Sequence, residues 1–372
     1  MKKNLWMLGM AVAALTSCTQ SEVVDIPENR VITFDTFLGK QSRTADVKGN
    51  MLIGAAGGDN DLTSFWVYGN YTGTESDDLT PFNGSDNSKV YWDQTNSAFK
   101  YDDARQWHMG TYHFTAYSNG NDKLDDVSFI ENSKIIFTDY VNDGNKDLVA
   151  SIPVKIVKNE GNMQGGVPLD FKHMMACIEL EFTNASNAYY LDFQNLKFSA
   201  KSKSTCTFDG TDIEWTDPAV DKEYEFITNV YDHNNTSSSN NNPNVLLSPS
   251  DKAKFHCFVI PQSNATIDLS FDIVSYTREP QLNNGGAPVV DAQGNPRYDY
   301  TFTSKKPYKA SLSITGEHAS WKPGILYKYS ASVSGTTYYI NFTVTSFEQW
   351  TSTEKPAVET PVTPTENSNA SN

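Results

Sequence analysis

Residues 265–276 read ATIDLSFDIVSY, and this stretch predicts the fold class most directly. Its apolar side chains stand at every second position, at Ile267, Leu269, Phe271 and Ile273, and polar residues separate them. Successive side chains of a β-strand point to opposite faces, so this alternation predicts a strand with one buried face. No capped pattern of helical spacing is sustained anywhere in the chain. The stretch therefore favours an all-β fold.

Similar short apolar stretches recur along the chain, separated by Asn, Asp, Gly, Ser and Pro. We expect strands at Val31–Leu38, Ser64–Tyr71, Val90–Trp92, Gly110–Tyr117, Lys134–Thr138, Leu148–Ile152, Leu169–Phe182, Phe255–Ile260, Tyr298–Phe302, Tyr308–Ile314, Ile325–Val333 and Tyr338–Phe347. In the first of these, Ile32, Phe34 and Thr36 fall on one face. No internal repeat of fixed period is apparent. The pattern is typical of β-sandwiches with few or short helices.

The chain has 372 residues, which is long enough for two domains. The Gly-rich segment 158–166 (KNEGNMQGG) is the expected boundary between them. We therefore predict an N-terminal β-sandwich at residues 31–165 and a C-terminal one at residues 166–352. Residues 229–244 are a low-complexity loop, and 280–298 a turn-rich excursion. The Pro- and Thr-rich residues 353–372 are predicted to be a disordered tail, because they contain few apolar side chains.

The N-terminus has the pattern of a lipoprotein signal peptide. Lys2 and Lys3 precede an apolar run, Leu5–Leu15, that is too short to span a bilayer as a mature helix. The run ends in LTSC, in which Cys18 follows a small residue, as in a bacterial lipobox. We expect residues 1–17 to be removed, Cys18 to be acylated, and residues 18–30 to form a tether. The alternative is an ordinary signal peptide that contains a cysteine.

The charge balance excludes one class of partner. The chain has 29 Lys and Arg against 45 Asp and Glu, and loss of the leader removes Lys2 and Lys3 as well. A nucleic-acid phosphate backbone requires many basic side chains, so we expect no nucleic acid as a partner. An acidic surface instead keeps an exported protein soluble.

Three cysteines remain after Cys18, namely Cys177, Cys206 and Cys257. An odd number cannot all pair within one chain. Cys177 and Cys257 lie in apolar strand patterns, where a free thiol behaves as a small hydrophobic group. Buried thiols are the favoured interpretation, and one disulfide is the alternative.

No pattern indicates catalysis or a cofactor. The six His residues form no H-E-x-x-H pair and no metal-ligand spacing with Cys, and there is no G-x-S-x-G or P-loop. His173 reads as a structural hydrogen-bonding residue. Asp143, Asn145 and Asp147 have the 1-3-5 spacing of a calcium loop, but Leu148 and Val154 stand where an EF-hand needs Gly and Glu. They are a weak metal candidate, and we expect no enzyme, although a distant glycosidase carboxylate pair stays open.

A series of short landmarks over nearly the whole chain resembles the fimbrillin family, the lipoprotein-derived type V pilus subunits of anaerobic gut and oral bacteria. The landmarks are Cys18, Arg43-Thr44-Ala45, Phe65-Trp66-Val67-Tyr68, Tyr112–Tyr117, Lys146–Ala150, Leu169–Ala176, Phe258–Gln262, Trp321-Lys322-Pro323-Gly324 and Phe347-Glu348-Gln349-Trp350. The resemblance implies two tandem transthyretin-like β-sandwiches. It also implies a lipoprotein of the outer membrane that assembles into a surface fimbrium serving adhesion.

In that family a trypsin-like protease cuts after an Arg that follows the first strand, and a strand from a neighbouring subunit fills the groove that opens. Arg43 matches that site, with Thr44 as the new N-terminus. Arg30 precedes the first strand and ranks second, and a plain surface Arg43 is the alternative. The expected partners are other fimbrial subunits, the protease, and the outer membrane through lipid on Cys18.

The C-terminus departs from the pattern of a stalk subunit, which needs a donor strand. Tyr338–Phe347 is one candidate donor, and the tail ordering upon insertion is another. If neither serves, the protein is a tip or accessory subunit. The alternative function is an outer-membrane surface lipoprotein that binds glycan or protein without polymerising.

Overall fold

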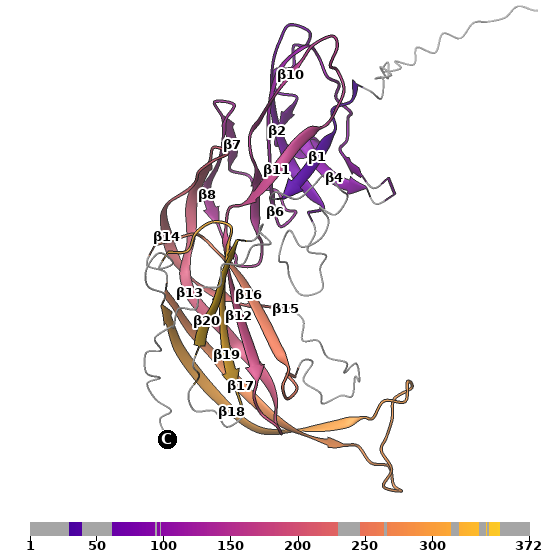
Figure 1. Cartoon of the computed structure of the whole chain (residues 1–372), viewed down its shortest axis with the longest axis vertical. Helices are drawn as coiled ribbons and strands as arrows, with labels where there is room; N and C mark the ends of the chain where they lie inside the picture. The colour runs from indigo at the N-terminus through magenta and orange to yellow at the C-terminus, as the bar shows by residue number, and fades with distance from the viewer. Residues whose placement is uncertain are drawn as a thin grey trace, which may run out of the picture.

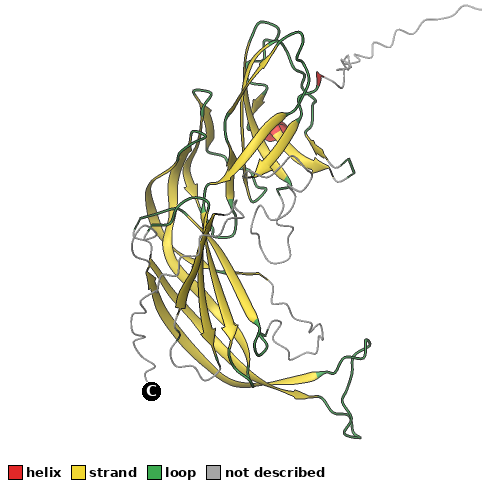
Figure 2. Cartoon of the chain, viewed as in Figure 1, coloured by secondary structure: helices red, strands yellow, loops and turns green. Residues whose placement is uncertain are grey.

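The chain is nearly all β, which confirms the predicted fold class (Figures 1 and 2). The structure is a computed structural model that describes residues 30–38, 62–93, 95–96, 98–229, 246–263, 266–313, 320–334, 340 and 342–349. Its strands form three sheets, of nine, five and six strands. The molecule is elongated, with the nine-stranded sheet in its upper part and the other two sheets in its lower part in Figure 1.

The nine-stranded sheet curls around an aromatic core. Its main path runs β1-β11-β9-β6-β2-β4-β5, with β10 and β3 pairing alongside. The bounds are β1 (Phe34–Leu38), β2 (Ser64–Thr72), β3 (Phe82–Asn83), β4 (Lys89–Asp93), β5 (Ala98–Lys100), β6 (Gly110–Asn119), β9 (Leu148–Ser151), β10 (Val154–Lys158) and β11 (Val167–His173). A single-turn 3₁₀ helix, η3 (Asp86–Ser88), joins β3 to β4. Buried Phe65, Phe82, Phe114 and Phe171 lie at the centre of this core.

The other two sheets pack face to face as a sandwich. The five-stranded sheet has the order β15-β16-β12-β19-β20, and the six-stranded sheet has β18-β17-β13-β8-β7 with β14 beside β13. The bounds are β12 (Ala176–Asn184), β15 (Ile227–Asn229), β16 (Lys252–Val259), β19 (Ile325–Val333), β20 (Phe342–Gln349), β7 (Val127–Ile130), β8 (Lys134–Val141), β13 (Tyr190–Phe208), β14 (Ile213–Glu225), β17 (Thr266–Pro280) and β18 (Tyr298–Ser313). Phe182 of β12 contacts Phe193 of β13 and Phe271 of β17 across this core.

Strand pairing does not divide the chain at the expected boundary of residues 165 and 166. β11 follows that boundary yet pairs with β1 and β9 in the nine-stranded sheet. β7 and β8 precede it, and β8 pairs with β13 in the sandwich. The expected strand Leu169–Phe182 is in fact two strands, because the chain crosses between sheets at Met174 and Met175. Apart from Lys158, which ends β10, the Gly-rich segment 158–166 is therefore the loop that joins β10 to β11 within the first sheet.

A third buried cluster joins the two parts. Trp66 and Tyr117 project from the nine-stranded sheet on the side away from its own core, and they join Phe137, Cys206 and Phe258 of the sandwich. Beside this cluster, the side-chain amide of Asn142 donates to the carbonyl of Phe258 and its side-chain oxygen accepts from the N–H of Gly144, which holds the start of the segment between β8 and β9 against β16. The two parts therefore share buried apolar surface.

Candidate functional site

The first strand occupies the edge of the nine-stranded sheet, at the place where the resemblance puts a removable strand. β1 has five residues and, among the described strands, pairs only with β11, in parallel and in the register Phe34 opposite Val167 through Leu38 opposite Phe171. A parallel pair is slightly less stable per residue than an antiparallel one. An edge strand can also leave a sheet without breaking pairs between other strands. β1 thus has the position of a strand that can be exchanged.

The inward side of β1 fills the aromatic core. Ile32, Phe34 and Thr36 are buried, whereas Thr33 and Asp35 are exposed, which confirms the predicted alternation. The ring of Phe34 lies edge to face with four others, at centroid distances of 5.3 Å to Phe82, 5.8 Å to Tyr101, 6.1 Å to Phe114 and 6.2 Å to Phe65. We call these four rings, together with residues 167–171 of β11, the β1 seat.

The residues just before β1 are held by a second segment, residues 105–107. The N–H of Ile32 donates to the carbonyl of Arg105 at 2.8 Å, and the N–H of Trp107 donates to the carbonyl of Arg30 at 2.8 Å. The Tyr101 hydroxyl donates to the carbonyl of Ile32 at 2.8 Å. Sequence reasoning missed this segment because it forms no strand, and its only signal is the pair of aromatics Tyr101 and Trp107.

Burial of β1 contributes a limited free energy. Full burial of a side chain such as Ile32 or Phe34 stabilises the fold by about 1.5–3 kcal/mol each. Departure of β1 would uncover these contacts and leave backbone groups of β11 without partners, which adds a further cost. A free seat therefore favours any strand that restores both the apolar contacts and the backbone pairing.

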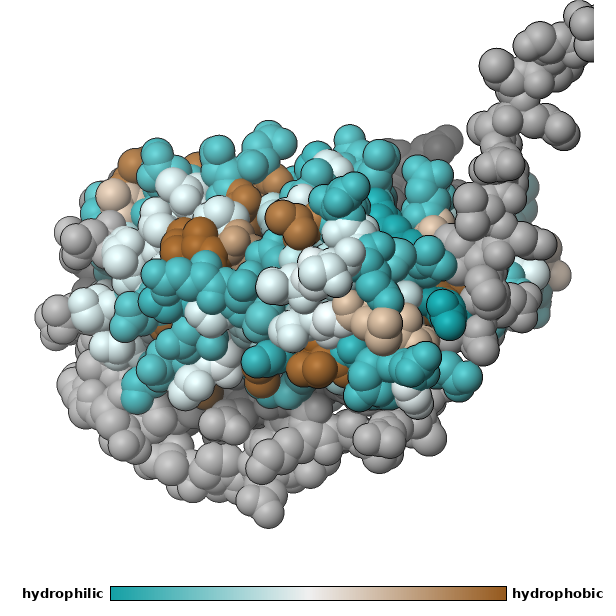
Figure 3. Space-filling model, turned by 90° about the horizontal axis from the view of Figure 1, so that it is seen from above, coloured by the Kyte–Doolittle hydropathy of each residue, from teal (hydrophilic) through white to brown (hydrophobic). Residues whose placement is uncertain are grey.

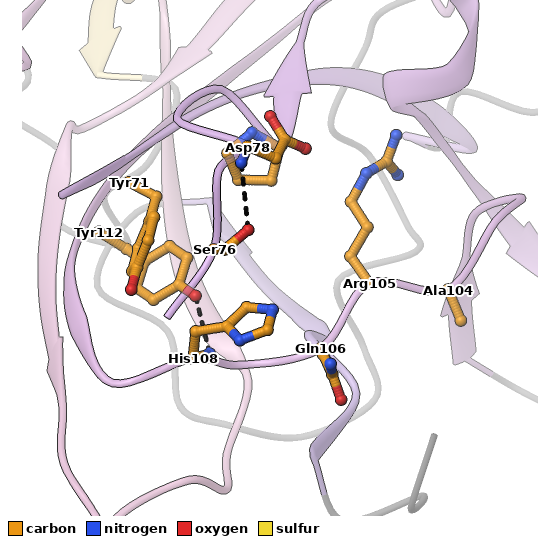
Figure 4. A pocket seen from close by; sticks show the side chains of 9 residues that line it. Tyr71, Ser76, Asp78, Ala104, Arg105, Gln106, His108 and Tyr112 are labelled. Atoms are coloured by element: carbon orange, nitrogen blue, oxygen red, sulfur yellow. Dashed lines mark hydrogen bonds between the residues drawn. The ribbon is translucent and has the colours of Figure 1, made fainter. Parts of the chain in front are cut away.

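Beside the β1 seat lies a partly open cavity of about 220 Å³ (Figure 4). Its lining comprises Tyr71, Ser76, Asp78, Pro81, Ala104, Arg105, Gln106, His108 and Tyr112. Two hydrogen bonds fix its wall, because the Tyr112 hydroxyl accepts from the N–H of His108 and the Ser76 hydroxyl from the N–H of Asp78. Burial raises the pKa of Tyr112 to about 12, so its hydroxyl stays protonated.

The predicted modification residues lie outside the described part of the chain. This applies to Cys18, Arg43 and Thr44, and also to residues 1–29 and 350–372. β1 ends at Leu38, five residues before Arg43 in the sequence. No helix in the described residues is long and apolar enough to cross a membrane.

The weak calcium candidate is not assembled in the structure. Asp147 is buried, and its carboxylate is hydrogen-bonded to the Nδ1 of His173, which confirms the structural role predicted for that histidine. Burial raises the pKa of Asp147. Asp143 is exposed, accepts from the N–H of Asn145, and lies 3.8 Å from the Lys146 ammonium. Among the described residues, no three His, Cys, Asp or Glu side chains form a group that could hold a metal ion.

The three cysteines are buried and unpaired, which confirms the favoured interpretation over a disulfide. Burial raises the pKa of the thiols of Cys177, Cys206 and Cys257. A thiol reacts as its thiolate, so these side chains act as small apolar groups of the core.

The last described strand belongs to the sandwich. β20 pairs antiparallel with β19 at the edge of the five-stranded sheet, and Ile340 and Phe342 are buried in the core. The candidate donor Tyr338–Phe347 thus includes residues already committed to this subunit's own sheet. Residues 335–339 and 341 lie outside the described part of the chain.

These features define a β-sheet protein whose first strand sits in an edge groove and whose described residues assemble no recognised catalytic or metal site. The chain belongs to the fimbrillin-like family, because the model of that family matches residues 55–350. It is therefore a fimbrial or adhesion-related protein of the cell surface that interacts with other fimbrial subunits. The family is one of structural surface proteins and not of enzymes.

Similar solved structures include proteins from Bacteroides species. A fimbrial protein from Bacteroides vulgatus ATCC 8482 is 16% identical, with a TM-score of 0.45 over 87% of this chain and 100% of that one. A candidate cell adhesion protein from Bacteroides uniformis ATCC 8492 is 13% identical, with a TM-score of 0.42 over 88% of this chain and 100% of that one. No curated protein matches the sequence.

Proposed function

We propose that this protein is a structural subunit of a surface fimbria, exported as a lipoprotein through Cys18 and assembled by protease-triggered strand exchange. The observation that carries the proposal is the position of β1, a five-residue parallel edge strand whose inward residues fill an aromatic groove. Family membership supports the fimbrial role.

Cleavage after Arg43 turns β1 into a separable strand. The cut leaves the lipid, the tether and β1 on one fragment, and the rest of the subunit starts at Thr44. Since β1 is then held only by non-covalent contacts, it can leave the seat. The vacated edge of β11 and the rings of Phe65, Phe82 and Phe114 then accept a strand from another subunit. Head-to-tail exchange of this kind builds an open filament.

We place the donor in the residues after Trp350. Withdrawal of β20 would remove Phe342 from the sandwich core, which is a large cost for a donor to meet. Val358, Thr360 and Val362 alternate in the tail as Ile32, Phe34 and Thr36 do in β1 and the two residues before it. A strand formed by these residues therefore presents the same spacing of inward side chains to the vacated seat.

Limited trypsin treatment of the mature protein tests the proposal. We expect one early cut after Arg43, followed by SDS-sensitive ladders of oligomers. Arg43→Ala should abolish both, whereas Arg30→Ala should leave both intact because cutting there frees only the tether. A cut product that stays monomeric would sink the self-polymerising role. N-terminal sequencing of the surface-exposed form adds an independent readout, since it should find Thr44 free.

A surface lipoprotein that binds glycan without polymerising is the second candidate, and the cavity of Figure 4 favours it. Hydroxyl, carboxylate and imidazole groups beside the ring of Tyr71 suit a sugar. However, ligand pockets commonly enclose about 300–1,000 Å³, and this cavity is smaller, so it fits at most a single sugar unit. A sugar-dependent rise in melting temperature that Asp78→Ala abolishes would support this function.

A further inference from the structure

The longest hairpin of the sandwich extends beyond the sheet that supports it. β17 pairs with β13 only as far as Tyr276 opposite Tyr190, whereas its pairing with β18 continues to Pro280 opposite Tyr298. Among the described residues, no third strand pairs with the part from Thr277 to Thr301. We call this two-stranded part the ribbon, and it projects from the lower end of the molecule in Figure 1.

The ribbon ends in a forked tip, residues 281–297, built from an eight-residue unit that occurs twice. Residues 282–289 read LNNGGAPV and residues 290–297 read VDAQGNPR, with Asn or Asp second, Gly fifth and Pro seventh in each. The structure repeats as well. Asn283 accepts from the N–H groups of residues 285 and 287, and Asp291 accepts from those of residues 293 and 295. Each unit is therefore one lobe closed by its own side chain.

Three backbone hydrogen bonds join the lobes to the ribbon. The N–H of Gln281 donates to the carbonyl of Arg297, that of Arg297 to Val289, and that of Val289 to Gln281, at 2.7–2.9 Å. Gly286 and Gly294 occupy equivalent positions with φ of 78° and 86°, a region that favours glycine. The tip thus has a defined shape that its own hydrogen bonds and glycines set.

The ribbon and tip expose apolar side chains. Leu282 and Val290, which begin the two lobes, are 60% and 50% exposed, and Phe302 at the base is 59% exposed. An isolated two-stranded hairpin is marginally stable in water, and exposed apolar groups on it are a recurrent sign of an interaction site. Arg278 of the ribbon lies between the rings of Tyr190 and Tyr298, at 4.8 and 3.9 Å from their centroids. Because Tyr190 belongs to β13, this contact supports the base of the ribbon where strand pairing with β13 ends.

The opposite end of the molecule carries a matching surface. β6 contacts the sandwich through Asn119, which accepts from the Tyr140 hydroxyl, so its first residue, Gly110, lies at the far end. The loop 73–81 and Met109 lie at this end, because Thr72 pairs with Thr111 and Tyr71 donates to the carbonyl of Met109. We call loop 73–81 with Met109 the distal pole. Figure 3 looks down on this end and shows apolar side chains scattered among hydrophilic ones.

Charge and hydrophobicity are complementary between the two ends. The distal pole exposes the apolar side chains of Leu79 and Met109, and its loop holds three carboxylates, Glu75, Asp77 and Asp78, without a basic residue. The tip has one cation, the exposed Arg297. Its one carboxylate, Asp291, is engaged within its own lobe, and the N–H of Asn295 lowers its pKa. Asp291 stays ionised, so the tip carries no net charge, but Asp291 is half-buried whereas Arg297 is exposed, and Arg297 therefore presents a positive charge that can pair with the acidic loop.

We propose that the forked tip binds the distal pole of a second copy of this chain and so forms a contact between consecutive subunits, separate from strand exchange. This inference rests on the proposed head-to-tail fimbria, in which the lower end of one subunit meets the upper end of the next. Leu282 and Val290 contact the apolar side chains of the pole, and Arg297 faces its acidic loop. The contact would orient the neighbour before its strand is exchanged.

Site-specific photocrosslinking tests the contact. A photoreactive phenylalanine analogue replaces Leu282 in the full mature chain, which is mixed with an isotope-labelled copy so that links between copies are recognised by mass. The matched control carries the same analogue at Val141, which is 62% exposed and lies in the middle of the molecule. We expect links from position 282 to residues 73–81 or 109 and none enriched there from position 141. Links from 282 that are absent, or spread as widely as those from 141, would overturn the proposal.

A charge exchange sharpens the test. Arg297→Asp and Asp77→Arg should each lower the yield of links by up to about fivefold, as expected for an exposed ion pair, and the two together should restore it. A double variant no better than the singles would show that these charges do not face each other. Running both uncut and trypsin-cut protein separates the two proposals. Crosslinks without oligomer ladders would support the tip contact and contradict strand exchange. Oligomer ladders without crosslinks would support strand exchange and contradict the tip contact.

Discussion

Phe34 holds β1 through its ring, which meets four aromatic rings, and no other described side chain of the strand does so. The neighbouring backbone bonds, from Ile32 to Arg105 and from Trp107 to Arg30, fix the entry to the strand but not the strand itself. Among the described side chains of the strand, the contacts with the seat therefore centre on the ring of Phe34, beside the five backbone pairs of the register.

Phe34→Ala should loosen β1 without unfolding the molecule. Loss of a buried Phe typically costs about 3–5 kcal/mol, and here release of the edge strand limits that cost. We expect faster amide hydrogen exchange in Val167–Phe171 of β11 and faster trypsin cleavage between residues 38 and 62. Thr33→Ala, at the exposed position just before the strand, is the control and should change neither. Unchanged exchange in β11 would show that Phe34 does not hold β1.

Glu179 should make stability depend on acidity. Burial raises its pKa, but the hydrogen bond from His256 at 2.7 Å and the nearby charges outweigh that effect and lower the pKa to about 2. A carboxylate with a depressed pKa in the folded state contributes stability that is present above its unfolded value, about 4.3, and lost as pH falls towards 2. Urea unfolding of wild type and Glu179→Gln should thus differ most at neutral pH and converge in acid. The exposed Glu223→Gln should show a difference below about 1 kcal/mol at every pH. A gap for Glu179→Gln that is constant with pH would contradict this account.

At the scale of elements, alternation predicted the strands whose inward positions are large and apolar. It found β1, β17 and β19 with small errors at their ends. It missed β13 because the buried positions of that strand pass from Phe198 to Ser202, Ser204 and Cys206, and small polar residues do not stand out as a core face. A register shift between Gln194 and Lys197 breaks its pattern further.

The domain boundary could not be predicted because Gly-rich composition marks a turn, whereas strand pairing decides to which sheet a segment belongs. Segment 158–166 is rich in Gly since it makes a turn, and Gly165 has a φ of 97°. The change of sheet instead occurs at Met174 and Met175, two fully buried apolar residues with no turn residue between them. The eight-residue duplication at 282–297 gives no repeat signal either, because two copies of a short turn motif make no extended period.

Gly294→Ala should disturb the forked tip and nothing else. Its φ of 86° is costly for a residue with a Cβ, by about 1–2 kcal/mol, although no atom lies within 4 Å of the position that Cβ would take. We expect faster amide exchange at Asn295 and Arg297 with an unchanged melting temperature. Ala292→Gly in the same lobe is the control. A clear fall in melting temperature would mean that the tip supports the sandwich after all.

For the whole molecule, the shared cluster around Trp66, Tyr117 and Phe258 makes the two parts interdependent. Differential scanning calorimetry of uncut protein should therefore show one unfolding transition, with calorimetric and van't Hoff enthalpies that agree. Two resolved transitions would show that the nine-stranded sheet and the sandwich unfold as independent domains. The expectation that nucleic acid is not a partner also concerns the whole molecule, because it depends only on the numbers of basic and acidic residues.

The exchange of β1 is the central claim, and the composition of the assembled fibre tests it most directly. Mature protein is cut after Arg43, the polymer is separated from monomer by size, and both are analysed by mass spectrometry. We predict a polymer of chains that begin at Thr44, with the fragment that carries Phe34 absent from it. A polymer that retains this fragment, or a cut chain that keeps it and stays monomeric, would contradict the account.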